Sequence, residues 1–99
     1  MVVVVKNLVP ACDTFDQGEI LRLAVLKQME NDEKVSVSFE GISYVTSSFV
    51  NAAFVGLLND LDIEQIKTRM SVIRSHRQIN DLVKSLVSHS AAKKAAHVF

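Results

Sequence analysis

The fold is decided by residues 35–58, VSVSFEGISYVTSSFVNAAFVGLL. Residues 35–39 alternate between apolar residues and serines, which is the side-chain period of a β-strand with one buried face. Residues 48–61 are apolar around almost their whole circumference, and this pattern predicts a largely buried helix. A Thr-Ser-Ser triplet lies between the two segments, so we expect Ser47 or Ser48 to cap the N-terminus of the helix.

Before this stretch, the chain predicts one strand and one helix. Val2–Val5 is a β-branched block of strand type. Thr14 and Gln17 have the spacing of a capping box, in which each side chain bonds the backbone of the other residue. A helix should therefore begin near Thr14 and end at residues 31–34.

After this stretch, we expect a polar connection at residues 63–68, a third strand at residues 69–74 and an amphipathic helix. Ser75 and Gln78 again have the spacing of a capping box. The apolar residues of the last helix recur at helical spacing, at Ile79, Leu82, Val83, Leu86 and Val87. Residues 91–99 either extend this helix or form a frayed tail.

The predicted order is β-α-β-α-β-α within a single domain that spans residues 1–99. Strands that alternate with helices form parallel sheets joined by right-handed crossovers. We therefore expect an α/β fold with an open, mainly parallel small sheet and helices mostly on one face. The serines of residues 35–39 would lie on the uncovered face. This face and the Val2–Val5 strand predict a homodimer.

Charge and composition exclude several classes of partner. The 11 basic and 11 acidic residues balance, so the chain has no net field that would attract nucleic acid or an anionic membrane. No apolar segment is long enough to span a bilayer, and the N-terminal run lacks the basic start and cleavage site of a signal peptide. A lone cysteine, Cys12, fits a reducing cytoplasm, where we expect the protein to be located. We expect no metal and no cofactor.

Candidate functional residues follow the strands. In an open α/β sheet, ligands bind beyond the carboxyl ends of the strands. Hydroxyl groups and a helix N-terminus follow the second strand, and a serine, a histidine and an arginine follow the third. These are the groups that a phosphate would need, either as a ligand or as a modification on serine. The alternative is that the serines only cap the two helices and the basic residues are solvated. The predicted docking residues are Ser43, Tyr44, Thr46, Ser47, Ser48, Phe49, Asn51, Ser75, His76 and Arg77.

Two alternative functions are a ligand sensor at the same edge of the sheet and an enzyme. A sensor of a small phosphate or nucleotide ligand would hold it through Ser47, Ser48, Ser75, His76 and Arg77. A catalytic pair of Cys12 with His76 or His89 is the other alternative, but no glycine elbow marks a nucleophile. We therefore expect a protein that is not an enzyme.

Residues 35–58 resemble the STAS domain of anti-sigma-factor antagonists, bacterial regulators in which a strand leads through an Asp-Ser-Ser-Gly turn into a helix. The chain is also similar, and more closely, to a STAS-like family of unknown function in which Ser-Phe replaces Ser-Gly. The residues that carry this likeness are Phe39-Glu40-Gly41-Ile42, Ser47-Ser48-Phe49 and Phe54. The order of elements extends the resemblance over nearly the whole chain.

The resemblance implies a regulatory module that docks a partner protein through the Ser-Ser turn and the helix after it. In the antagonists, an ATPase-type kinase that is also the anti-sigma factor phosphorylates the serine before the glycine, and phosphorylation abolishes binding. That serine corresponds to Ser48, and Ser47 is a second candidate phosphoacceptor. Thr46 stands where the antagonists have Asp, and Phe49 stands where they have Gly. We expect Phe49 to restrict the access of a kinase to Ser48. A phage or mobile-element inhibitor of a host complex would reuse the same surface.

Overall fold

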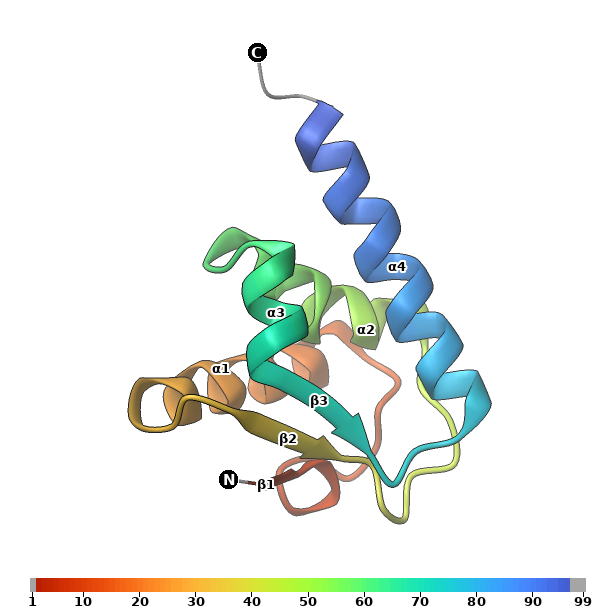
Figure 1. Cartoon of the computed structure of the whole chain (residues 1–99). Helices are drawn as coiled ribbons and strands as arrows, with labels where there is room; N and C mark the ends of the chain where they lie inside the picture. Colours follow the sequence, from red (N-terminus) through yellow and green to blue (C-terminus); the bar gives the residue numbers. More distant parts are fainter. Residues whose placement is uncertain (1, 97–99) are drawn as a thin grey trace.

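The computed structural model describes residues 2–96, including the side chains of residues 2–92. Three parallel strands and four α-helices make a small α/β fold (Figure 1). Its elements are β1 (Val2–Val4), η1 (Val5–Asn7), α1 (Phe15–Asn31), β2 (Val35–Ser38), α2 (Ser47–Ala53), η2 (Val55–Asn59), α3 (Ile63–Arg69), β3 (Met70–Ile73) and α4 (Arg77–Ala96), where η denotes a 3-10 helix.

The sheet has the strand order β1-β2-β3. Val3, Val37 and Val72 are aligned across it and pack into the hydrophobic core. On the opposite face, Ser36 and Ser71 lie beside each other, with 3.1 Å between their hydroxyl oxygens. Ser71 is exposed and Ser36 is half-buried, so this part of the second face is open to solvent.

Two details of the sheet differ from the prediction. The first strand ends at Val4, because Val5 already belongs to the 3-10 turn of η1. Ser38, predicted on the uncovered face, is buried. The chain turns back over this serine after β2, and the Ser38 hydroxyl accepts a hydrogen bond of 3.4 Å from the backbone N–H of Glu40.

α1 begins as its sequence predicts and crosses α2 at close range. Thr14 and Gln17 form the capping box: the Thr14 hydroxyl accepts from Gln17 N at 3.2 Å, and Gln17 Oε1 accepts from Thr14 N at 3.1 Å. At Gly18, an added Cβ would lie 2.4 Å from the carbonyl oxygen of Phe49 and 2.6 Å from the Cβ of Ala52. The missing side chain of Gly18 therefore sets the position of the first turn of α2.

The segment predicted as a polar connection, residues 63–68, is instead a helix, α3. Asp62 caps it with a second capping box, because Asp62 Oδ1 accepts from Gln65 N at 2.8 Å and Gln65 Oε1 accepts from Asp62 N at 3.0 Å. Ile66 is buried against the core and holds the helix in place. The order of the main elements is therefore β-α-β-α-α-β-α rather than strictly alternating.

The long helix predicted at residues 48–61 is interrupted. α2 ends at Ala53, and the chain continues after Phe54 as the 3-10 helix η2. The hydrogen bond from Leu57 N to Phe54 O, at 3.1 Å, has the tighter i→i+3 spacing. Gly56 lies within this turn and is a poor α-helix former, by about 1 kcal/mol relative to alanine.

Arg69, the last residue of α3, fixes the C-terminus of α1. Its guanidinium donates to the carbonyl oxygens of Met29 at 2.7 Å, Asp32 at 3.3 Å and Glu33 at 3.0 Å. A helix C-terminus leaves carbonyl groups unbonded and carries partial negative charge, so a guanidinium stabilises it. The C-terminal ends of α1 and α3 are thus joined.

The last helix is longer than its buried part. Ile79, Val83 and Val87 are buried at helical spacing, as predicted. Beyond them α4 continues to Ala96, and in Figure 1 its C-terminal half projects past the other elements. Of the predicted tail at residues 91–99, residues 97–99 lie outside the described residues. Within residues 2–96, no helix combines the length and apolarity that a membrane span requires.

Candidate functional site

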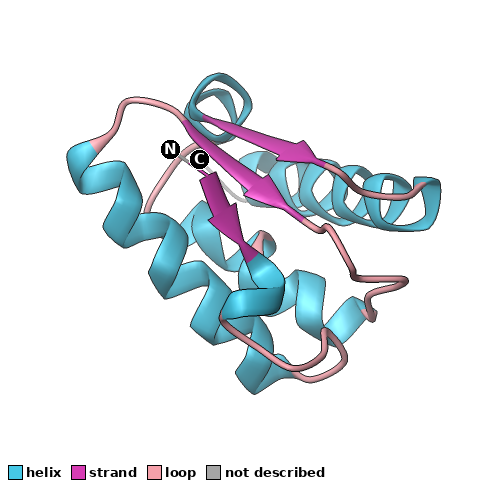
Figure 2. Ribbon diagram, turned by 90° about the horizontal axis from the view of Figure 1, so that it is seen from below, coloured by secondary structure: helices cyan, strands magenta, loops and turns pink. Residues whose placement is uncertain are grey.

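The three strands run in the same direction, so their carboxyl ends lie at one edge of the sheet (Figure 2). After β2, the chain leads to α2 through residues 40–46. We call this connection, together with the first two residues of α2, the Ser-Ser turn (residues 40–48). It contains half of the ten docking residues that the sequence predicts. Of the other five, Phe49 and Asn51 lie on α2, and Ser75, His76 and Arg77 lie at or just before the start of α4.

The Ser-Ser turn is built around two buried anchors. Gly41 adopts a φ of 82°, a left-handed conformation that side chains disfavour, and the turn closes with a hydrogen bond of 2.9 Å from Ile42 N to Phe39 O. Ile42 and Val45 are buried. The two residues between these anchors, Ser43 and Tyr44, are pushed outward, and Tyr44 is 58% exposed.

Two other parts of the chain hold the turn in place. Thr46 donates from its backbone N–H to the Cys12 carbonyl oxygen at 3.1 Å, and from its hydroxyl to the Asp13 carbonyl oxygen at 3.0 Å. Gln78, near the start of α4, brackets the Val45 backbone with two bonds: its Oε1 accepts from Val45 N at 3.2 Å and its Nε2 donates to Val45 O at 3.1 Å. The turn is therefore a fixed surface feature, anchored before α1 and on α4.

Thr46 is the N-cap of α2, so the prediction that Ser47 or Ser48 caps this helix is wrong. The Thr46 hydroxyl accepts from Phe49 N at 3.3 Å while it donates to Asp13. Ser47 and Ser48 are the first two residues of the helix, and both are exposed. Within the described residues neither serine hydroxyl makes a hydrogen bond, so both remain available to a partner or a modifying enzyme.

Phe49 is fully buried, and its predicted role in docking is therefore wrong. One helical position after two exposed serines, its side chain points into the hydrophobic core. For the same reason the expectation that Phe49 shields Ser48 does not hold, because a side chain in the core cannot cover the surface beside it. Phe49 anchors the first turn of α2 from inside.

The capping box predicted from Ser75 and Gln78 does not form, since Gln78 is engaged with Val45. The Ser75 hydroxyl instead pairs with the side chain of Asn80. His76 and Arg77 are exposed at the beginning of α4. The bonds between Gln78 and Val45 place this end of α4 beside the Ser-Ser turn, a contact that no local spacing in the sequence indicated.

Cys12 lies beneath the turn and has the environment of a structural thiol. It is 3% exposed, and burial, with a smaller contribution from Asp13, raises its pKa to about 11. The thiol is therefore protonated at neutral pH, which disfavours a nucleophilic role. Among the described residues, no group of three histidine, cysteine, aspartate or glutamate side chains is arranged to hold a metal ion.

The chain was compared with curated proteins, solved structures and models of protein families. Neither curated proteins nor solved structures contain a significant match to the chain. A family model, described as a STAS-like domain of unknown function (DUF4325), matches residues 17–79. The matched segment runs from the first turn of α1 to the first turn of α4 and includes the Ser-Ser turn. On this match over more than half of its length, the chain belongs to the family of STAS-like domains of unknown function.

Proposed function

We propose that this chain is a non-enzymatic, cytoplasmic interaction module that docks a partner protein through the Ser-Ser turn and the exposed side of α2. The single observation that carries the proposal is the construction of the turn. An exposed aromatic residue, Tyr44, and three exposed serines are held on a backbone that other elements fix by hydrogen bonds. A fixed loop loses little conformational entropy on binding, and tyrosine is enriched among the residues that dominate interface energies.

A phosphorylation switch at Ser48 is the second part of the proposal, with Ser47 as the alternative acceptor. Both serines are exposed at the beginning of α2, and within the part of the chain that the structure describes neither hydroxyl is hydrogen-bonded. A phosphoryl group would add about −1.5 to −2 charge there, which a helix N-terminus tolerates but a partner seated on the turn would not. An ATPase-type kinase is the partner that fits this chemistry, by analogy with the anti-sigma-factor antagonists.

Self-association is the third part. We propose that the helices lie mostly on one face of the sheet and that a second copy covers the edge of β1 or the face that carries Ser36 and Ser71. Val2, at the open edge of the sheet, is 51% exposed, and Ser71 is exposed. Light scattering at high micromolar concentration should give the mass of a dimer, and a monomeric mass would refute this part.

The docking proposal is tested by site-specific photocrosslinking in cells. p-Benzoylphenylalanine in place of Tyr44 should form a discrete adduct with one protein, whereas the same amino acid at the exposed Asn31 of α1 should not. The captured protein should bind the purified chain, and Tyr44→Ala should weaken that binding by at least about tenfold. An unchanged affinity in Tyr44→Ala would refute docking through the turn.

Intact mass tests the switch. A gain of one phosphate with ATP and the captured partner, abolished in Ser48→Ala but not in Ser47→Ala, supports Ser48 as the acceptor. No gain with tight binding leaves the docking function alone. A thermal shift with phosphate or nucleotides would instead favour a small-ligand sensor, because a ligand at a hundredfold excess over its dissociation constant stabilises by about 2.7 kcal/mol.

A further inference from the structure

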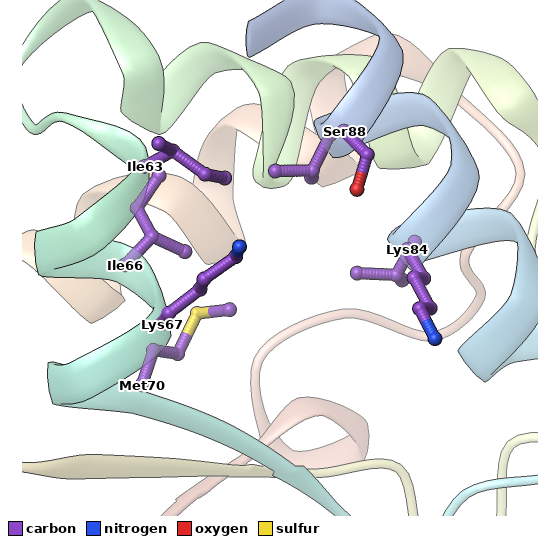
Figure 3. Close-up of a pocket in the computed structure, with 8 residues that line it drawn as sticks. Ile63, Ile66, Lys67, Met70, Lys84 and Ser88 are labelled. Atoms are coloured by element: carbon purple, nitrogen blue, oxygen red, sulfur yellow. The ribbon is translucent and has the colours of Figure 1, made fainter.

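An open groove lies between α3 and α4, away from the Ser-Ser turn (Figure 3). One side is formed by Ile63, Ile66 and Lys67 of α3 and by Met70, the first residue of β3. The α4 side contributes Val83, Lys84, Val87 and Ser88. The groove exists because residues 63–69 form a helix that stands beside α4 rather than a loop. It is therefore a feature that the polar connection expected from the sequence would not have produced.

The floor and walls of the groove are apolar. Ile66, Val83 and Val87 are buried, while Ile63 and Met70 are half-buried and partly open to the groove. The volume of the groove is about 170 Å³. A cavity of about 150 Å³ accommodates benzene, so the space suits one large apolar side chain. The thioether of Met70 can adjust to the shape of what enters.

The rim of the groove is positively charged on both sides. Lys67 on α3 and Lys84 on α4 are exposed, and none of the described residues that line the groove is a carboxylate. In Figure 3 the Lys67 side chain extends toward the space between the two helices, whereas the ammonium group of Lys84 points away from it. Among the described residues, neither lysine takes part in an ion pair. An apolar floor excludes a phosphate group as the main occupant, because buried apolar surface offers it no hydrogen-bond donors.

We infer that this groove binds an acidic amphipathic segment of a partner protein, with a large apolar side chain in the groove and carboxylates beside Lys67 and Lys84. Charge complementarity selects this occupant over a basic or neutral one. Helices and short segments commonly bind in this way, with apolar anchors at helical spacing. The site shares α4 with the Ser-Ser turn but uses a later part of that helix, so it is a separate surface.

The test is a selection of random peptides displayed on phage against the whole purified chain. Enriched peptides should carry a large apolar residue next to aspartate or glutamate. Ser88→Trp, which changes an exposed rim residue and fills the groove, should weaken their binding by at least tenfold without lowering the melting temperature. Lys67→Ala with Lys84→Ala should weaken it by about two- to fivefold per lysine. The matched pair Lys27→Ala with Lys34→Ala, exposed on α1 and after it, should have no effect.

Two further measurements test whether the selected peptides bind in the groove: the salt dependence of their affinity and the amide resonances that they shift. The affinity of the selected peptides should fall as salt is raised, because exposed charge pairs are screened. Their binding should shift the amide resonances of Ile66, Val83 and Val87 rather than those of Ser43 and Tyr44. The inference is overturned if no acidic apolar family is enriched, or if the enriched peptides bind Ser88→Trp as well as they bind the wild type.

Discussion

Thr46→Ala should destabilise the fold more than any serine change in the same turn. The threonine hydroxyl caps α2 by accepting from Phe49 N, and it ties the turn to the segment before α1 by donating to Asp13 O at 3.0 Å. Loss of an N-cap costs about 1 kcal/mol, and loss of a typical net hydrogen bond costs about 1 kcal/mol more. We therefore expect a decrease of about 2 kcal/mol in the free energy of unfolding.

The matched controls are the two neighbouring serines. Ser47 and Ser48 are exposed and their hydroxyls are unbonded within the described residues, so each change to alanine should stay within about 0.5 kcal/mol of the wild type. Thr46→Ser keeps the hydroxyl and should recover most of the loss. The melting temperature of Thr46→Ala should fall by roughly 8–16 °C, since 1 kcal/mol corresponds to about 4–8 °C in a domain of this size.

Urea unfolding followed by far-ultraviolet circular dichroism measures these differences in one series. The reasoning is refuted if Ser47→Ala or Ser48→Ala lowers the free energy of unfolding by more than about 1 kcal/mol while Thr46→Ala leaves it unchanged. That outcome would show that a serine is the N-cap of α2, and this serine would no longer be a candidate phosphoacceptor. Hydrogen exchange of the Phe49 amide gives an independent readout, because this N–H is the one that Thr46 caps.

Three further predictions concern the core and its edges. Gly18→Ala places a Cβ 2.4 Å from a backbone oxygen of α2 and should cost about 3 kcal/mol by overpacking, more than the ~1 kcal/mol gained in helix propensity. Gly56→Ala is its control in urea unfolding and should cost less, because its Cβ meets the Arg22 side chain at 2.8 Å rather than backbone, and a side chain can shift even where, as here, it is paired with Glu19 and Asp60. The Cys12 thiol has a pKa of about 11 in the folded chain and near 9.0 in the unfolded chain, so the unfolded state ionises first as the pH rises. The free energy of unfolding should therefore be constant below pH ~9 and fall by at most ~2.7 kcal/mol between pH ~9 and ~11. In the same assay, Cys12→Ala should lack this part of the pH dependence. Arg69→Ala should cost about 2 kcal/mol and speed hydrogen exchange at the C-terminus of α1, and Arg69→Lys should not restore it, because an ammonium cannot reach three carbonyl groups as a guanidinium fork does.

The strongly periodic segments of the chain could be predicted from the sequence, because the contacts that define them are local or repeat at a fixed spacing. The capping box of Thr14 and Gln17 is contained within four consecutive residues, and it formed as predicted. Ile79, Val83 and Val87 follow the helical period and are buried. α3 was missed because it buries a single residue, Ile66, so its apolar signal is weak.

The construction of the Ser-Ser turn could not be predicted, since its decisive contacts join residues far apart in the chain. Thr46 bonds Asp13, and Gln78 bonds Val45; in each pair the partners are 33 residues apart. From local spacing, the sequence instead predicted Ser47 or Ser48 as the N-cap of α2 and a capping box between Ser75 and Gln78. Two of the four hydrogen bonds that fix the turn are made by Gln78, for which the sequence predicted a bond with Ser75. The α3–α4 groove, too, required a helix that the sequence pattern did not reveal.

The two departures from the antagonist pattern, threonine for aspartate and phenylalanine for glycine, have a common physical explanation. An aspartate at position 46 could accept from the Phe49 amide, but an ionised carboxylate has no proton to donate to the Asp13 carbonyl oxygen, whereas a hydroxyl does both. At position 49 the side chain points into the core, where a phenyl ring adds buried apolar area that glycine cannot supply. Thr46 and Phe49 thus stabilise the Ser-Ser turn through contacts beneath its surface, and they leave Ser47 and Ser48 exposed. The difference in motif therefore favours a more stable turn whose proposed docking surface is still accessible to a partner.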